Sequence, residues 1–108
     1  MQSKNTINVN EENKQKYDAI VSYLQILYHS NSKLFIRRPG EGIKTIELKN
    51  ILPEERKYKF VNYLLNAEQE GAELYVKKPN HELHRLLLLE TLHHGQIPKV
   101  VTNKKKRD

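Results

Sequence analysis

The stretch KLFIRRPGEGIKTIEL, residues 33–48, decides the fold expected for this chain. Apolar and polar side chains alternate over residues 33–38, a period of two that is typical of a strand with one buried face. The PGEG that follows has the composition of a turn. Residues 43–48 alternate again, with Ile46 and Leu48 as the inward pair. The stretch therefore predicts a β-hairpin.

A helix is expected on each side of this hairpin. Residues 11–29 carry apolar side chains at helical spacing, and Asn10 is the expected N-cap. Pro53 and the two glutamates after it mark the start of a second helix, which runs to about Glu70. Gly71 then suits the left-handed position that commonly ends a helix.

A second pair of strands follows the second helix. Residues 72–77 alternate, with Leu74 and Val76 pointing inward. Residues 85–89 are rich in leucine, which predicts a strand that is buried on both faces or lies at the centre of the sheet, and irregular chain is expected beyond Gly95. The order α-β-β-α-β-β predicts a small α+β domain with both helices on one face of a four-stranded sheet, antiparallel or mixed. No internal repeat is identified.

Length and composition limit the class of protein. The 108 residues suffice for one domain with a modest core. The absence of cysteine excludes disulfides and thiolate zinc sites. The start of the chain is polar, and no apolar run approaches the roughly 18 residues of a membrane span. We therefore expect a cytoplasmic protein without a membrane partner.

The basic excess of the chain gathers at its end. Lys and Arg number 19 against 13 Asp and Glu, for a net charge of +6. Three segments are expected: a disordered lead-in at 1–10, the domain at 11–98 and a basic tail at 99–108. Such a tail either binds nucleic acid or only keeps the chain soluble. Its phosphate-binding candidates are Lys104, Lys105, Lys106 and Arg107.

The uncovered face of the sheet is the candidate binding site. Strand parity places Phe35 and Arg37 on that face, and Tyr75 and Lys77 likewise. Aromatic rings stack on the bases of a single strand while cations neutralise its phosphates. The plainer interpretation is that aromatics favour strands and that cations favour surfaces. Further candidates for phosphate contacts are Arg38, Lys44, Lys78 and Arg85.

No motif for catalysis or metal binding is found. His81, His84 and the pair at 93–94 lack the spacing of a zinc site. No Gly-rich phosphate loop or nucleophile elbow is present. Glu90 stands alone after the leucine run, whereas two-metal chemistry needs a second ligand. The sequence therefore predicts no catalytic residue, no metal, no cofactor and no enzyme.

The segment NAEQEGAELYVKKPNHELHRLLLLETL, residues 66–92, resembles the central part of RepB-like primases from plasmids and other mobile elements. The matching positions are Asn66, Ala67, Gly71, Leu74, Tyr75 and Pro79. Where that family carries paired metal-binding aspartates, this chain has Leu89-Glu90-Thr91-Leu92. The resemblance therefore implies a primase-like fold that holds single-stranded template without the metal chemistry.

In size and character the chain is also similar to the small middle protein of staphylococcal cassette replication operons, whose gene lies between those for a DNA polymerase and a helicase. This resemblance implies single-stranded-DNA binding, a complex with the polymerase and a helicase as a further partner. The expected function is thus a DNA-binding accessory of a mobile-element replication complex. The alternative is a protein-interaction module that inhibits or adapts a replication protein without binding nucleic acid.

Overall fold

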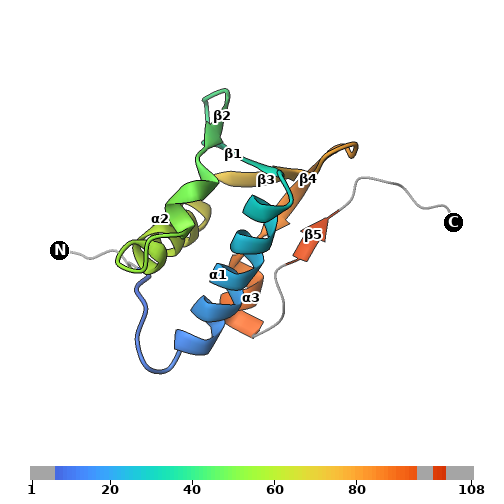
Figure 1. The fold of residues 1–108 in the computed structure, drawn as a ribbon. Helices are drawn as coiled ribbons and strands as arrows, with labels where there is room; N and C mark the ends of the chain where they lie inside the picture. Colours follow the sequence, from blue (N-terminus) through green and yellow to red (C-terminus); the bar gives the residue numbers. More distant parts are fainter. Residues whose placement is uncertain (1–6, 95–98, 102–108) are drawn as a thin grey trace, which may run out of the picture.

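Two long helices and an antiparallel sheet make up the protein (Figure 1). The computed structural model describes residues 7–94 and 99–101. The sheet has the strand order β2-β1-β3-β4-β5, and every neighbouring pair is antiparallel. The elements in chain order are α1 (Lys14–His29), β1 (Lys33–Arg37), β2 (Ile43–Ile46), the 3₁₀ helix η1 (Leu48–Ile51), α2 (Lys57–Gln69), β3 (Glu73–Lys77), β4 (Leu83–Leu87), α3 (Leu89–His94) and β5 (Lys99–Val101).

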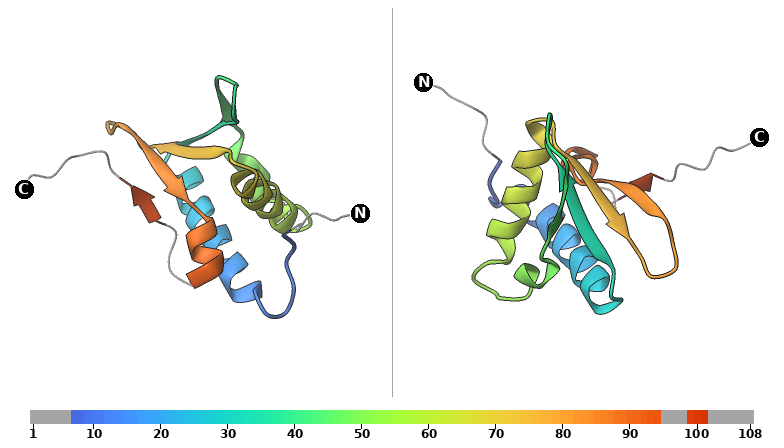
Figure 2. Two further views of the ribbon diagram at one scale, coloured as in Figure 1. Left: turned by 180° about the vertical axis from the view of Figure 1, so that it is seen from behind. Right: turned by 90° about the horizontal axis from the view of Figure 1, so that it is seen from above.

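Both long helices cover the same side of the sheet, as Figure 2 shows. The core lies between them and the inward side chains of β1 and β3, where Leu34 and Leu74 are fully buried. Leu24 of α1 and Leu64 of α2 are buried against the same cluster. The predicted α+β class, the order of elements and the inward faces of these two strands are confirmed. A fifth strand, β5, extends the predicted sheet.

The chain consists of two copies of one supersecondary unit, so the expectation that it holds no internal repeat is wrong. Each copy runs from a long helix through a hairpin to a short helix: residues 14–51 form the first half and residues 57–94 the second. Phe35 pairs with Thr45 in the first hairpin, and Tyr75 pairs with Arg85 in the second. Equivalent positions therefore lie 40 residues apart, and the two hairpins have the same register.

Backbone details repeat at the same interval. Asn31 and Gly71, which follow the long helices, both have a positive φ, at 63° and 104°. Gly40 and Asn80, in the hairpin turns, have φ of 77° and 62°. These are left-handed conformations that glycine and asparagine adopt more readily than other residues. The two halves thus turn the chain in the same way with different residues.

The two halves meet along β1 and β3, where Phe35 lies opposite Tyr75. Because these residues are equivalent and the strands are antiparallel, an approximate two-fold axis passes between them. The axis relates β1 to β3 and β2 to β4. Phe35 and Tyr75 therefore lie at the centre of the joint sheet.

The helices begin later than the sequence indicates. The Asn10 side chain accepts hydrogen bonds from the N–H groups of Glu12 and Asn13, at 2.9 and 3.0 Å, and so forms a turn ahead of α1 rather than its N-cap. The Pro53 carbonyl accepts the N–H groups of Arg56 and Lys57, both at 3.0 Å, in a turn ahead of α2. In both cases the signal for a helix start marks a preceding turn.

The leucine run leaves the sheet earlier than expected. β4 ends at Leu87, and Leu89 begins α3. At this point Oε1 of Glu68 in α2 accepts the N–H groups of Leu88 and Leu89 at 3.1 and 3.0 Å. Similarly, Leu48 begins η1 instead of ending β2, and it is buried there.

The domain includes residues on both sides of the predicted range 11–98. In the segment assigned to the lead-in, the Ile7 N–H donates to Asn66 Oδ1 at 2.7 Å and the Ile7 carbonyl accepts from Asn66 Nδ2 at 2.9 Å. In the segment assigned to the tail, β5 pairs with β4. The candidates Lys104, Lys105, Lys106 and Arg107 lie outside the described residues.

Candidate nucleic-acid interface

The face of the sheet turned away from the helices carries an aromatic pair at its centre. Residues opposite one another form the row Thr45, Phe35, Tyr75, Arg85 across four strands. Phe35 and Tyr75 are both half-buried, whereas their neighbours Leu34 and Leu74 are fully buried on the helix side. The pairing thus places Phe35 and Tyr75 on one face, as strand parity predicts.

On one side of this row the charges are compensated. Arg37 lies opposite Glu73, and its Nη2 is 3.0 Å from Glu73 Oε1. Arg85 Nη1 lies 4.0 Å from Glu73 Oε2. The Tyr75 hydroxyl also donates a short hydrogen bond to Glu73, and this bond and the Arg37 guanidinium lower the pKa of Glu73. The same hydrogen bond raises the pKa of Tyr75.

On the other side of the row two cations face each other. Lys33 lies directly opposite Lys77, and both are exposed. Like charges at opposed positions on neighbouring strands repel and destabilise the pair. No salt bridge to either lysine is found within residues 7–94 and 99–101. This side of the aromatic pair is therefore the part of the face best suited to an anion.

Lys33 and Glu73 are absent from the residues predicted for the site. Both have the parity of the aromatic residues, at positions 33, 35 and 37 on β1 and 73, 75 and 77 on β3. The same period that identified Phe35 and Tyr75 would have found them. On strands β1 to β4 this face carries four cations and one carboxylate, namely Lys33, Arg37, Lys77, Arg85 and Glu73.

Two predicted phosphate contacts lie elsewhere. Arg38 turns to the helix side, where its Nη2 donates to the Tyr63 hydroxyl at 2.8 Å and its guanidinium lies over the Tyr63 ring. Lys44 is opposite the buried Ile36, so it has the parity of the helix side, and it pairs with Glu41 at 3.4 Å. Lys78 is exposed in the turn after β3. Of the four further candidates on the strands and turns, Arg85 alone lies on the open face.

No group of three or more His, Asp or Glu residues within the described chain is arranged to hold a metal ion. His81 lies in the second hairpin turn, with Nδ1 at 2.8 Å from the Pro79 carbonyl. No helix in the same part of the chain combines the length and the apolar character needed to cross a membrane.

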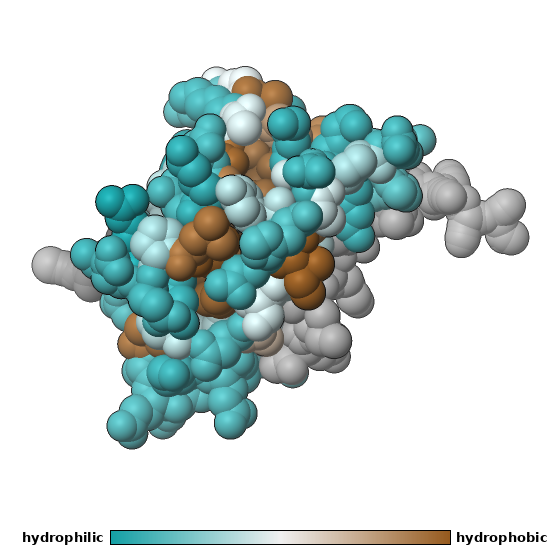
Figure 3. Space-filling view, in the orientation of Figure 1, coloured by the Kyte–Doolittle hydropathy of each residue, from teal (hydrophilic) through white to brown (hydrophobic). Residues whose placement is uncertain are grey.

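The helix side exposes few apolar side chains to a protein partner. Tyr23 and Tyr58 pack against the core, whereas Ile26 is 64% exposed and Tyr63 is 46% exposed. Figure 3, which views the molecule as in Figure 1, shows the apolar residues of that side in separate patches with polar residues between them. A large continuous apolar patch, the usual mark of a protein-binding surface, is not seen in that view.

Comparison with known proteins adds neither a relative nor a family. No family model, no curated protein and no solved structure matches the chain.

Proposed function

We propose that the open face binds single-stranded DNA and that the chain is a non-catalytic accessory of a replication or priming complex. One observation carries the proposal: Phe35 lies opposite Tyr75 at the centre of a face with four cations and one carboxylate. Half-buried rings are held in place by their neighbours yet leave a surface on which bases stack. Stacking is tolerant of sequence, so little base preference is expected.

A sheet face of this kind favours single strands over duplex. Bases in a duplex are already stacked on each other, and their edges are reached through a groove by a helix or a narrow ribbon. Unpaired bases can lie flat on aromatic rings instead. Arg85 extends the row beyond Tyr75, although Glu73 offsets part of its charge.

The partners follow from the resemblance to the primase and middle-protein families. A DNA polymerase is the proposed protein partner, with a helicase in the same complex, and the element served is a mobile one. The alternative, an interaction module without DNA affinity, would use the helix side, where the exposed apolar residues are scattered.

The proposal is tested by fluorescence anisotropy with labelled single-stranded and duplex oligonucleotides over a series of salt concentrations. The wild-type chain should prefer the single strand. The double variant Phe35→Ala, Tyr75→Ala should weaken that binding by about ten-fold or more, since each stacked base contributes about 1–3 kcal/mol. The loss should persist in salt, because stacking is screened less than exposed charge.

Tyr63→Ala is the matched control, because it removes an aromatic ring that is 46% exposed on the helix side. It should leave DNA affinity unchanged. Equal affinity of the wild type and the double variant would exclude this face as the binding site. Absence of single-strand binding at moderate salt, together with capture of a polymerase by the chain, would favour the interaction module.

A further inference from the structure

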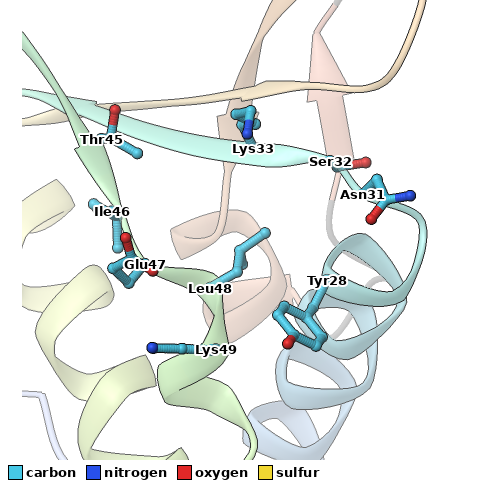
Figure 4. Close-up of a pocket in the computed structure, with 9 residues that line it drawn as sticks. All are labelled: Tyr28, Asn31, Ser32, Lys33, Thr45, Ile46, Glu47, Leu48 and Lys49. Atoms are coloured by element: carbon cyan, nitrogen blue, oxygen red, sulfur yellow. The ribbon is translucent and has the colours of Figure 1, made fainter.

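A pocket of about 350 Å³ borders the open face at the Lys33 side of the aromatic pair. Lys33 of β1 and Thr45 of β2 line it. Lys33 is two residues before Phe35 on the same face of β1, and Thr45 lies directly opposite Phe35 on β2. Figure 4 shows the Tyr28 ring of α1 and the start of η1 on the opposite side of the pocket. The pocket therefore continues the open face from Phe35 towards the end of α1.

At the position of Tyr28 the second half of the molecule carries a different kind of side chain. Glu68 is the equivalent of Tyr28, and its carboxylate bonds the N–H groups of Leu88 and Leu89. The equivalent residues of the first half, Leu48 and Lys49, line the pocket. Glu68 thus joins the end of its long helix to the following short helix, and within the described residues Tyr28 makes no hydrogen bond of this kind to Leu48 or Lys49.

The groups around the pocket are those that recognise a nucleotide. Tyr28 supplies an aromatic ring that is 37% exposed. Lys33 supplies a cation between this ring and Phe35, and Asn31 supplies an amide. The Glu47 carboxylate faces the same space and accepts hydrogen bonds from an exocyclic amino group. Such a carboxylate favours cytosine over thymine, whose base edge offers no amino group.

We propose that this pocket is a nucleotide subsite of the strand-binding face. A base stacks on Tyr28, and its 5′-phosphate contacts Lys33 at the border with Phe35. The inference rests on the proposed function, since it adds one nucleotide to the strand held by Phe35 and Tyr75. It assigns Tyr28, Lys33 and Glu47 to binding, and none of the three is a residue that the sequence pattern singled out.

Titration of the ¹⁵N-labelled full chain with dCMP, followed by NMR, tests the pocket on its own. Shifts should centre on the amides of residues 31–33 and 45–49. Deoxycytidine, which lacks the phosphate, should bind more weakly, and Lys33→Gln should remove that difference. A probe without an amino group, dTMP, should bind more weakly than dCMP.

Tyr28→Glu replaces the stacking ring by the side chain of the equivalent position in the second half, where the carboxylate bonds two backbone N–H groups. It should weaken dCMP binding by about five-fold or more. Ile26→Glu adds the same charge on an exposed part of α1 and should have no such effect. Tyr28→Leu removes the ring without adding charge, and it keeps the test decisive if the glutamate variant does not fold.

The outcomes separate the pocket from the proposed function. Equal dCMP shifts in the wild type and in both Tyr28 variants, or no shifts at millimolar dCMP, would overturn the subsite. If the wild type still binds oligonucleotides through Phe35 and Tyr75 in that case, the proposed function stands without it. If oligonucleotide binding does not depend on these two rings but the dCMP shifts do depend on Tyr28, the pocket binds nucleotides and the proposed role of the aromatic pair is wrong.

Discussion

The two halves of the molecule share a backbone and differ in their surfaces. Residues 14–51 and 57–94 have the same order of elements and the same hairpin register, 40 positions apart. Their buried positions match as well: Leu34 and Leu74 are both fully buried, and so are Leu24 and Leu64. The core therefore constrains the buried positions of both halves in the same way, and the two halves differ at positions outside the core.

Those differences gather around the aromatic pair and the pocket. The two-fold axis relates Arg37 to Lys77 and Glu73 to Lys33. Because Glu73 is a carboxylate where the first half has a lysine, Arg37 and Glu73 form an ion pair on one side of the row, whereas two lysines face each other on the other side. The axis also relates Glu68, which bonds the N–H groups of Leu88 and Leu89, to Tyr28, which lines the pocket. The cationic side thus joins Lys33 of the first half to Lys77 of the second, and the compensated side joins Arg37 to Glu73.

The largest effect is expected where the halves agree. Leu34→Ala and Leu74→Ala should each lower the free energy of unfolding by about 2–5 kcal/mol, because each removes a fully buried side chain from the same core. Urea unfolding measures both losses, which should be similar because the two sites are equivalent in the repeat. Leu52→Ala, at a leucine that is 41% exposed, is the control and should cost far less. A large difference between the two core variants would show that the halves support the core unequally.

An intermediate effect is expected at Glu68. Glu68→Ala should lower the free energy of unfolding by about 1–2 kcal/mol, because it leaves the N–H groups of Leu88 and Leu89 without their acceptor. Tyr28→Ala, at the equivalent position, removes no such bond and should cost less. Urea unfolding of both variants checks the difference. Equal losses would mean that the carboxylate does not hold α3 in place.

Glu68 should also make the stability of the chain depend on pH. Burial raises the pKa of Glu68 above its usual value of 4.5, against the lowering effect of the two backbone hydrogen bonds. The folded chain therefore holds this proton more tightly than the unfolded chain. Stability from Glu68 is fully present below pH 4.5 and is lost as the pH rises through the raised pKa. Relative to Glu68→Gln, the wild type should therefore lose stability as the pH rises above 4.5, which thermal unfolding of both proteins over a pH series measures.

The sequence predicts the parts of the fold that depend on local period. Alternation places Leu34 and Leu74 inward and Phe35 and Tyr75 outward, and the structure agrees. It does not predict α3, where Glu68, 20 positions before Leu88 in the chain, accepts the N–H groups of Leu88 and Leu89. A tertiary hydrogen bond of this kind leaves no trace in local pattern.

The internal repeat can be found in the sequence, but the similarity between the two halves is low. Residues 40 apart are identical at few positions, among them Val21 and Val61, Leu34 and Leu74, and Pro39 and Pro79. Most other equivalents share only their character, as Phe35 and Tyr75 do. Packing constrains hydrophobicity and size more than identity, so a repeat of one fold survives with little matching sequence.

For the candidate site, the aromatic pair was predictable and its electrostatics were not. Parity gives the face of Phe35 and Tyr75, but which cations remain uncompensated depends on the strand pairing. Arg37 lies opposite Glu73, and Lys77 lies opposite Lys33, only because β1 and β3 are antiparallel with this register. Arg38 has the parity of Leu34 and Ile36, so the strand period already points it to the helix side, but its partner there, Tyr63 on α2, comes from the tertiary fold.

The smallest expected effect concerns the opposed lysines. Lys33→Glu would give Lys77 the cross-strand partner that Glu73 gives Arg37, and it would end the repulsion between the two ammonium groups. It should raise the free energy of unfolding by about 0.5 kcal/mol, a gain that salt reduces. Thermal unfolding at low and high salt measures it. Lys33→Gln removes only the repulsion and should give part of the gain.

The same substitution should weaken single-strand binding, because it removes the cation that borders both Phe35 and the pocket. Stability and affinity are thus expected to move in opposite directions at one position. A purely structural lysine would show the first change and not the second. If Lys33→Glu stabilises the chain and leaves oligonucleotide affinity intact, the cationic side of the face has no part in binding, and the difference between the halves is one of stability alone.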